Sequence, residues 1–280
     1  MYNNLKDAYD HKKNVDDVLH NKAIEIFFEY LMIGGMPEAV NIFLSTNNFQ
    51  ETRKVIVELY DNYLSDMELY QASSEAIVRA KKVFENIYSQ LNKESKNFKP
   101  SLLEKDLRNR NLQSSLDWLM FAFLIPKSAL IKENVTIPLL ENSDSIYRLY
   151  LTDMGIFTYQ SGVNAKYFLS KEGRNTLSGI FYENYVAVEL MSLGYKLYYW
   201  KGKQDAEFEY LIDDGENIIP IDVKKKKGSL KSLEKYKSHN KLKYAVKVSE
   251  NSYRYDEDNK VLTLPFYYVS FFLAEFKKNK

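Results

Sequence analysis

The sequence predicts a mixed α+β protein, with a helical N-terminal region, then a small unit of helices and a hairpin, then a C-terminal α/β core. Three observations lead to this fold class. Apolar residues recur at helical spacing from about residue 15 to residue 70. Short strand-like runs follow further helical segments between residues 77 and 153, and side chains alternate as in a strand from residue 207. We therefore expect three consecutive regions, 1–76, 77–160 and 161–280.

The first region is expected to be a helical packing unit. Its predicted helices are Val15–Met32, Glu38–Leu44 and Glu51–Tyr70. The first helix should end at Gly34, because glycine is favoured just after a helix C-terminus. Pro37 suits the start of the second helix, since the first helical position needs no N–H donor.

The second region is expected to contain three helices and then a small hairpin. The predicted elements are a helix ending at Leu91, a short helix at 100–108, a helix at Asn111–Phe123, and strands at Ala129–Lys132, Val135–Leu139 and Arg148–Leu151. This order resembles a winged helix, whose third helix would face a DNA groove. Arg108 and Arg110 are then the expected nucleic-acid contacts. Because most of that helix is apolar, a structural or protein-contact role is favoured over sequence-specific DNA reading.

Two expected strands of the third region carry acidic side chains and a lysine on matching faces. Alternation places Asp222 and Lys224 on one face of the second strand, and Glu209 on a corresponding face of the first. The Asp-Asp-Gly-Glu-Asn segment at 213–217 has the residues of a hairpin turn. Glu183 precedes the hairpin on an expected amphipathic helix. The strands could therefore bring Glu209, Asp222 and Lys224 together.

This order resembles the PD-(D/E)xK phosphodiesterases, with their restriction-endonuclease-like core. The resemblance implies that Glu183, Glu209 and Asp222 are ligands of Mg²⁺, with Mn²⁺ as an alternative, and that Glu209, Asp222 and Lys224 are catalytic. Mg²⁺ prefers hard oxygen ligands, usually one or two carboxylates with water and phosphate. The metal would polarise the scissile phosphate, and the ammonium would offset charge that develops in the transition state.

Glu209 departs from the pattern of this superfamily, in which aspartate normally stands at that position. Its extra methylene moves the carboxylate outward, which Mg²⁺ geometry does not easily accommodate. Glu207 lies on the same expected face, either as a substitute or as a solvated neighbour. The alternative for the whole set is a charged, solvent-facing sheet surface.

A lysine-rich tract follows the expected site. Between Lys224 and Lys247 there are ten lysines and one glutamate, Glu234. The tract could follow a phosphate backbone, and its expected nucleic-acid contacts are Lys225, Lys226, Lys227 and Lys231. The alternative is a solvated helix face, since apolar residues in this tract have helical spacing. Strands at Tyr244–Val248 and Val261–Leu264 should extend the sheet, and 266–276 should close the chain as an aromatic helix or strand.

Three segments extend the resemblance to almost the whole chain. They are Tyr30–Val40 (YLMIGGMPEAV), Tyr147–Gly155 (YRLYLTDMG) and Pro220–Lys224 (PIDVK). They resemble the C-terminal region of bacterial and archaeal AAA-type ATPases, which has a winged helix and a nuclease-like domain of unsettled function. The chain has no G-x-x-x-x-G-K-[ST] motif, so it cannot bind ATP by that route. Either it is the C-terminal part of such an ATPase, or it is a stand-alone relative without the motor.

Composition limits the remaining function classes. The net charge of +1 gives no general attraction to nucleic acid, so contacts must come from local patches. The absence of cysteine excludes disulfides, thiolate nucleophiles and cysteine-based zinc sites, and three histidines make a histidine-based metal site unexpected. The most apolar run, Leu116–Ile131, is too short and interrupted to cross a bilayer. We expect a cytoplasmic protein without membrane partners.

Three functional hypotheses follow from these observations. The first is a Mg²⁺-dependent DNA phosphodiesterase. The second is a catalytically silent regulatory or protein-interaction module that docks on an ATPase domain or another protein. The third is a DNA-binding adaptor that does not cleave. Metal binding at Glu209 and Asp222 would distinguish the first from the second.

Overall fold

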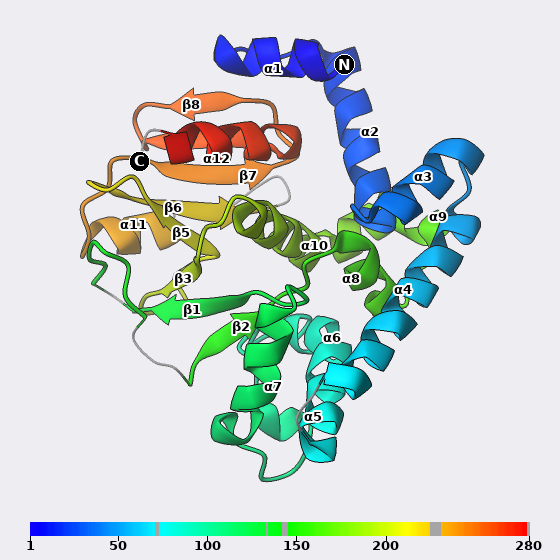
Figure 1. Cartoon of the computed structure of the whole chain (residues 1–280). Coiled ribbons are helices and arrows are strands. Elements are labelled where there is room, and N and C mark those ends of the chain that lie inside the picture. The colour runs from blue at the N-terminus through cyan, green and yellow to red at the C-terminus, as the bar shows by residue number, and fades with distance from the viewer. Residues whose placement is uncertain (71–72, 133, 142–144, 225–230, 279–280) are drawn as a thin grey trace. The chain divides into compact units, whose positions relative to one another are not determined.

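The computed structural model is a mixed α+β protein with a helical N-terminal region and two mixed β-sheets, which confirms the expected fold class (Figure 1). The structure describes residues 1–70, 73–132, 134–141, 145–224 and 231–278. It divides into two compact units. Unit 1 comprises residues 1–28, 128–144 and 189–280, and unit 2 comprises residues 29–127 and 145–188. These interleaved units differ from the three consecutive regions expected from the sequence.

The larger sheet of unit 1 contains five strands in the order β5-β6-β7-β9-β8. Their bounds are Tyr210–Asp213 (β5), Ile218–Val223 (β6), Ala245–Ser249 (β7), Arg254–Asp256 (β8) and Val261–Pro265 (β9). β5 and β6 form the predicted antiparallel hairpin, while β6, β7 and β9 run parallel. The Asp214 carboxylate accepts backbone N–H bonds from Glu216 and Asn217, which fixes the turn. β8, which the sequence analysis did not predict, pairs with β9 and is the edge strand of the sheet.

A second sheet of unit 1 includes β1 (Lys127–Ile131), β3 (Leu197–Lys201) and β4 (Glu207–Phe208). β1 pairs in parallel with β3, with Ser128 opposite Leu197. The prediction of a strand at Val135–Leu139 is wrong, because these residues form no strand. Pro138 lacks an N–H and cannot donate to a ladder. The hairpin expected between this segment and Ala129–Lys132 is therefore absent.

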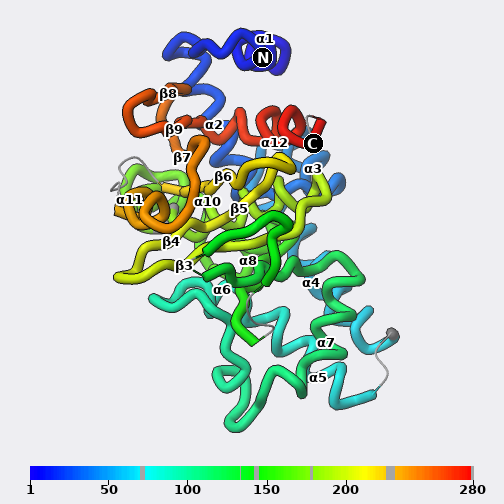
Figure 2. Tube along the Cα trace, turned by 90° about the vertical axis from the view of Figure 1, so that its left-hand side faces the viewer, coloured from blue at the N-terminus to red at the C-terminus, as the bar shows by residue number. Residues whose placement is uncertain are grey.

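Helices from opposite ends of the chain lie side by side in unit 1 (Figures 1 and 2). α1 (Tyr2–Asp10) lies next to α12 (Val269–Lys278), which follows a short 3-10 helix, η2 (Phe266–Tyr268). The Tyr9 hydroxyl donates to Oε2 of Glu275. The ring of Phe27 stacks on that of Phe266 at a centroid distance of 4.4 Å. These contacts hold both ends of the chain in one unit.

Unit 2 is mainly helical, and its helices largely follow the predicted ones. They are α3 (Pro37–Thr46), α4 (Phe49–Tyr70), α5 (Ser74–Glu85), α6 (Ile87–Leu91), η1 (Pro100–Leu102), α7 (Asn109–Phe121), α8 (Met154–Ser161) and α9 (Ala165–Phe168), with a short strand, β2 (Tyr147–Leu149). α2 (Asp17–Ile33) and α10 (Lys171–Ser192) each contribute residues to both units. The expected helix at 100–108 is reduced to the turn η1. The helix ending at Leu91 is interrupted at Asn86, whose amide donates to the Lys82 carbonyl.

Two segments of the proposed family resemblance contact each other in unit 2 through the buried carboxylate of Asp153. Asp153 Oδ1 accepts the Ile156 N–H at 2.9 Å and caps α8, while Oδ2 accepts the Gly35 N–H at 2.8 Å. Gly34 ends α2 with φ of +74°, and a Cβ there would lie 2.4 Å from Asp153 Oδ1. A side chain at position 34 would therefore clash with the Asp153 carboxylate, which explains the glycine at this position.

Gly155→Ala is expected to lower the free energy of unfolding by about 1–3 kcal/mol, because an alanine Cβ would lie 2.6 Å from the Ile33 carbonyl oxygen and force the backbone apart. Urea unfolding followed by circular dichroism measures the loss. Gly179→Ala is the matched control, since a Cβ at that helical position meets nothing within 4 Å and should stabilise the helix by up to about 1 kcal/mol. Equal stability of the two variants would contradict the packing argument.

Within the described residues, none of the helices has the length and apolar character needed to cross a membrane.

Candidate active site

Glu209, Asp222 and Lys224 meet in unit 1, as the sequence predicted. Glu209 occupies a bend between β4 and β5, Asp222 belongs to β6, and Lys224 follows the end of β6. The Lys224 ammonium lies 3.0 Å from Glu209 Oε1 and 3.1 Å from Asp222 Oδ1. The Lys224 ammonium therefore forms an ion pair with each of the two acids.

Glu209 is the most deeply buried member of the cluster. Its side chain is 2% exposed, against 16% for Asp222 and 38% for Lys224. Oε2 of Glu209 accepts the backbone N–H of Val223 at 3.0 Å, which fixes its carboxylate against β6. Each carboxylate oxygen has two lone pairs, so these bonds leave capacity for a further partner.

The crowding of two acids shifts the pKa values of the cluster. Burial and the nearby charge of Glu209 raise the pKa of Asp222 to about 7, although Lys224 opposes this rise. Burial alone lowers the pKa of Lys224, but the charges of Glu209 and Asp222 outweigh it and raise the pKa overall. Lys224 therefore stays protonated at neutral pH and acts as a fixed positive charge rather than as a base.

The pair Glu209 and Asp222 has the chemistry to hold a divalent cation. Both are hard oxygen donors, and a cation beside them would relieve the repulsion that raises the pKa of Asp222. Across the ranges that the structure describes, no group of three or more Asp, Glu, His or Cys side chains is arranged to hold a metal ion. A metal at this pair would thus depend on water or substrate oxygens for its other ligands.

Glu183, the third expected ligand, belongs to unit 2. It is buried in α10, and its Oε1 accepts a hydrogen bond from the ammonium of Lys96. No local pattern indicates this partner, because Lys96 lies in a polar segment between helices. Two of the three expected metal ligands are therefore together in unit 1.

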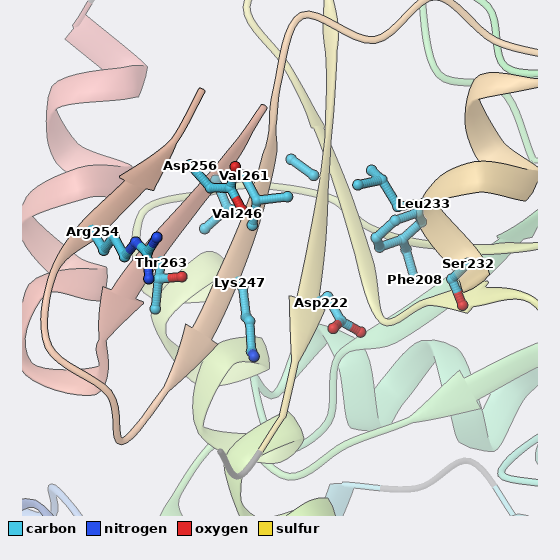
Figure 3. A pocket seen from close by; sticks show the side chains of 11 residues that line it. Phe208, Asp222, Ser232, Leu233, Val246, Lys247, Arg254, Asp256, Val261 and Thr263 are labelled. Carbon is cyan, nitrogen blue, oxygen red and sulfur yellow. The ribbon is translucent and has the colours of Figure 1, made fainter. Parts of the chain in front are cut away.

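A row of polar residues extends from Asp222 across the larger sheet (Figure 3). Asp222 is in register with Lys247 on β7, Lys247 with Thr263 on β9, and Thr263 with Arg254 on β8. These four residues line a cavity of about 160 Å³, and Figure 3 shows Asp222 and Lys247 pointing to the same side. The sequence analysis missed this row, because it depends on strand order and on a strand that was not predicted.

The other basic residues expected to contact nucleic acid are spread over the chain. Lys231 is exposed at the start of α11 (Lys231–Lys237), whose buried Leu233 and Tyr236 agree with a solvated helix face. Arg108 and Arg110 are exposed at the start of α7 in unit 2. Lys225, Lys226 and Lys227 lie outside the described residues.

The fold and the site define a mixed α+β protein with two acids and a lysine beside a cavity that has both apolar and polar walls. The chain belongs to the family described as Domain of unknown function (DUF8612), whose model matches residues 24–167, just over half of the chain. A second model, Domain of unknown function (DUF4143), matches residues 178–267, which include Glu183, Glu209, Asp222 and Lys224. Comparisons with curated proteins and with solved structures give no match.

Proposed function

We propose that the cluster of Glu209, Asp222 and Lys224 is the active site of a Mg²⁺-dependent DNA phosphodiesterase. The observation that supports this most directly is the convergence of three side chains that the PD-(D/E)xK resemblance singled out, with the ammonium 3.0 and 3.1 Å from the two carboxylates. A solvent-facing charged surface would not bury Glu209 to 2% exposure.

Each residue has a distinct part in the proposed reaction. Glu209 and Asp222 would hold Mg²⁺ or Mn²⁺, which when bound would polarise the scissile phosphate. Lys224, kept protonated by its neighbours, would offset the negative charge that grows on the phosphate oxygens. A bound cation would also keep Asp222 ionised, because it would offset the burial and the charge of Glu209 that raise the pKa of this group.

The polar row beside Asp222 is a suitable surface for phosphates next to the scissile one. Strands are spaced by about 4.8 Å, so Lys247 and Arg254 lie one and three strands from Asp222. Their positive charges and the Thr263 hydroxyl are the usual donors to phosphate oxygens. Lys231, Arg108 and Arg110 are proposed as further phosphate contacts.

The test is cleavage of linear, circular and single-stranded DNA with Mg²⁺ and with Mn²⁺. Asp222→Asn is expected to reduce cleavage at least about 100-fold, because it removes one of the two charged oxygen donors. Lys224→Met should cause a loss of similar size. Glu207→Gln is the matched control, since Glu207 precedes Glu209 by two residues and is not part of the cluster.

Two outcomes would contradict the phosphodiesterase proposal. One is no cleavage with either metal by a protein whose circular dichroism spectrum shows it to be folded. The other is cleavage that persists unchanged in Asp222→Asn, because this would indicate a contaminating nuclease.

A catalytically silent module is the second candidate, and the surroundings of Glu209 favour it. Both of its carboxylate oxygens already bond to Val223 and Lys224, and glutamate stands where the superfamily normally has aspartate. In this case the chain would regulate an AAA-type ATPase domain or another protein in the cytoplasm, or bind DNA without cleaving it. DNA binding without cleavage, with both metals present, would support the DNA-binding form of this candidate.

A further inference from the structure

Unit 2 contains a cavity of about 570 Å³ that is independent of the acid–lysine cluster. All of its lining residues lie between Met32 and Lys166, within the part of the chain that matches DUF8612. Its apolar walls are formed by Met32, Ile33, Phe49, Ile56, Tyr159 and Ala165. This volume and lining are typical of a small-molecule site.

The two threonine hydroxyl groups in the cavity wall already donate to the chain itself. Thr52 Oγ1 donates to the Asn48 carbonyl at 3.0 Å, and Thr158 Oγ1 donates to the Leu31 carbonyl at 2.6 Å. The polar side-chain groups that remain for a ligand are therefore the two cations, the amides of Gln50 and Asn164, and the Tyr159 hydroxyl.

Two of these groups are cations, Arg53 of α4 and Lys166 of α9. Arg53 is half-buried, donates through Nη1 to the Val163 carbonyl at 3.2 Å, and lies 5.3 Å from the Tyr159 ring centroid. These contacts fix its guanidinium at the wall and use one of its five N–H donors. Among the residues that the structure describes, neither Arg53 nor Lys166 forms an ion pair, and the lining contains no Asp or Glu.

We propose that this cavity binds an organic anion, with an apolar or aromatic body and one carboxylate, sulfonate or phosphate group. The body would lie against the apolar walls, where its transfer from water is favourable. The anionic group would accept hydrogen bonds from Arg53 and Lys166, whose charges have no carboxylate in the wall to neutralise them. A cationic ligand would be repelled by the same two residues.

The test compares two fluorescent probes that share an aromatic body. 8-Anilinonaphthalene-1-sulfonate carries an anionic group, and N-phenyl-1-naphthylamine lacks it. The double variant Arg53→Gln/Lys166→Gln is expected to bind the sulfonate at least about tenfold more weakly and the uncharged probe within about twofold of the unaltered protein. Ala165→Phe, which fills the cavity, should weaken binding of both probes.

Lys54→Gln is the matched control, because Lys54 is exposed, follows Arg53 on α4 and does not line the cavity. It should leave both affinities unchanged. The proposal is overturned if the sulfonate binds the double variant as tightly as the unaltered protein. It is also overturned if the double variant weakens both probes equally, since the cavity would then not select for the anion. Circular dichroism confirms that each variant is folded before titration.

Discussion

Asp222→Asn is expected to raise the free energy of unfolding by about 2–4 kcal/mol at pH 8 in the absence of divalent metal. In the folded protein, burial and the charge of Glu209 raise the pKa of Asp222 from 3.8 to about 7. Above pH 7 Asp222 is ionised in both states, and its charge is less favourable in the folded protein than in the unfolded chain. Ionisation therefore lowers the free energy of unfolding. Asparagine keeps the shape of the side chain and removes that charge.

The pH dependence has a definite sign. Between about pH 4 and pH 7 the folded protein holds a proton on Asp222 that the unfolded chain has released. The contribution of this group to stability is complete below pH 4 and is lost as the pH rises to 7. The difference in the free energy of unfolding between Asp222→Asn and the unaltered protein should therefore grow from pH 4 to pH 7 and then level off. Urea unfolding at a series of pH values measures it.

Asp214→Asn provides a control of opposite sign on the same hairpin. Burial acts to raise the pKa of Asp214, but Lys243 at 3.0 Å and the backbone N–H groups of Asn217 and Glu216 outweigh it and lower the pKa to about 2. Asp214→Asn should therefore reduce stability above pH 4, by about 1 kcal/mol. If Asp222→Asn were no more stable than the unaltered protein at pH 8, the crowding of the two carboxylates would be contradicted.

The stabilisation expected for Asp222→Asn bears on what the cluster does. A chain selected for stability alone would not keep two carboxyl groups beside one lysine when one neutral substitution relieves their mutual repulsion. Such a conflict between local stability and residue choice is typical of functional sites. A bound cation would offset the repulsion between the two carboxylates. The stability measurement therefore tests the proposed metal site separately from any cleavage of DNA.

Local patterns were sufficient to predict the part of the site that one hairpin builds. Alternation over β6 and the residues of the 213–217 turn placed Asp222 and Lys224 opposite Glu209, and the structure has this arrangement. The helices α2, α3 and α4 were also predictable, since their apolar spacing, Gly34 and Pro37 are local signals.

The rest of the site depends on contacts distant in sequence. Glu209 was expected inside a continuous strand, but the chain bends there and passes from β4 in one sheet to β5 in the other. Alternation does not show such a bend, because Phe208, Glu209 and Tyr210 are all buried. The row from Asp222 to Arg254 needs the strand order β6-β7-β9-β8, for which no local pattern exists.

Asp153→Ala is expected to lower the free energy of unfolding by about 3–5 kcal/mol, because it removes one carboxylate that serves two segments of unit 2. The backbone N–H groups of Gly35 and Ile156 both donate to Asp153. Burial raises the pKa of this carboxyl group, and hydrogen bonds from backbone N–H groups oppose that rise. Alanine would leave buried donors without an acceptor in addition to uncapping α8.

Two comparisons separate the cap from the loop contact in the Asp153 prediction. Ser73→Ala removes only an N-cap, the 3.2 Å bond from Ala76 N–H at the start of α5, and should cost about 1 kcal/mol. Asp153→Asn keeps one acceptor oxygen and should lower the free energy of unfolding by about 1–2 kcal/mol. Hydrogen exchange should accelerate in the peptide around Gly35 for Asp153→Ala, but not for Ser73→Ala. If Asp153→Ala cost no more than Ser73→Ala, the carboxylate would be a helix cap alone, and the acceptor for the Gly35 N–H group would have to be water.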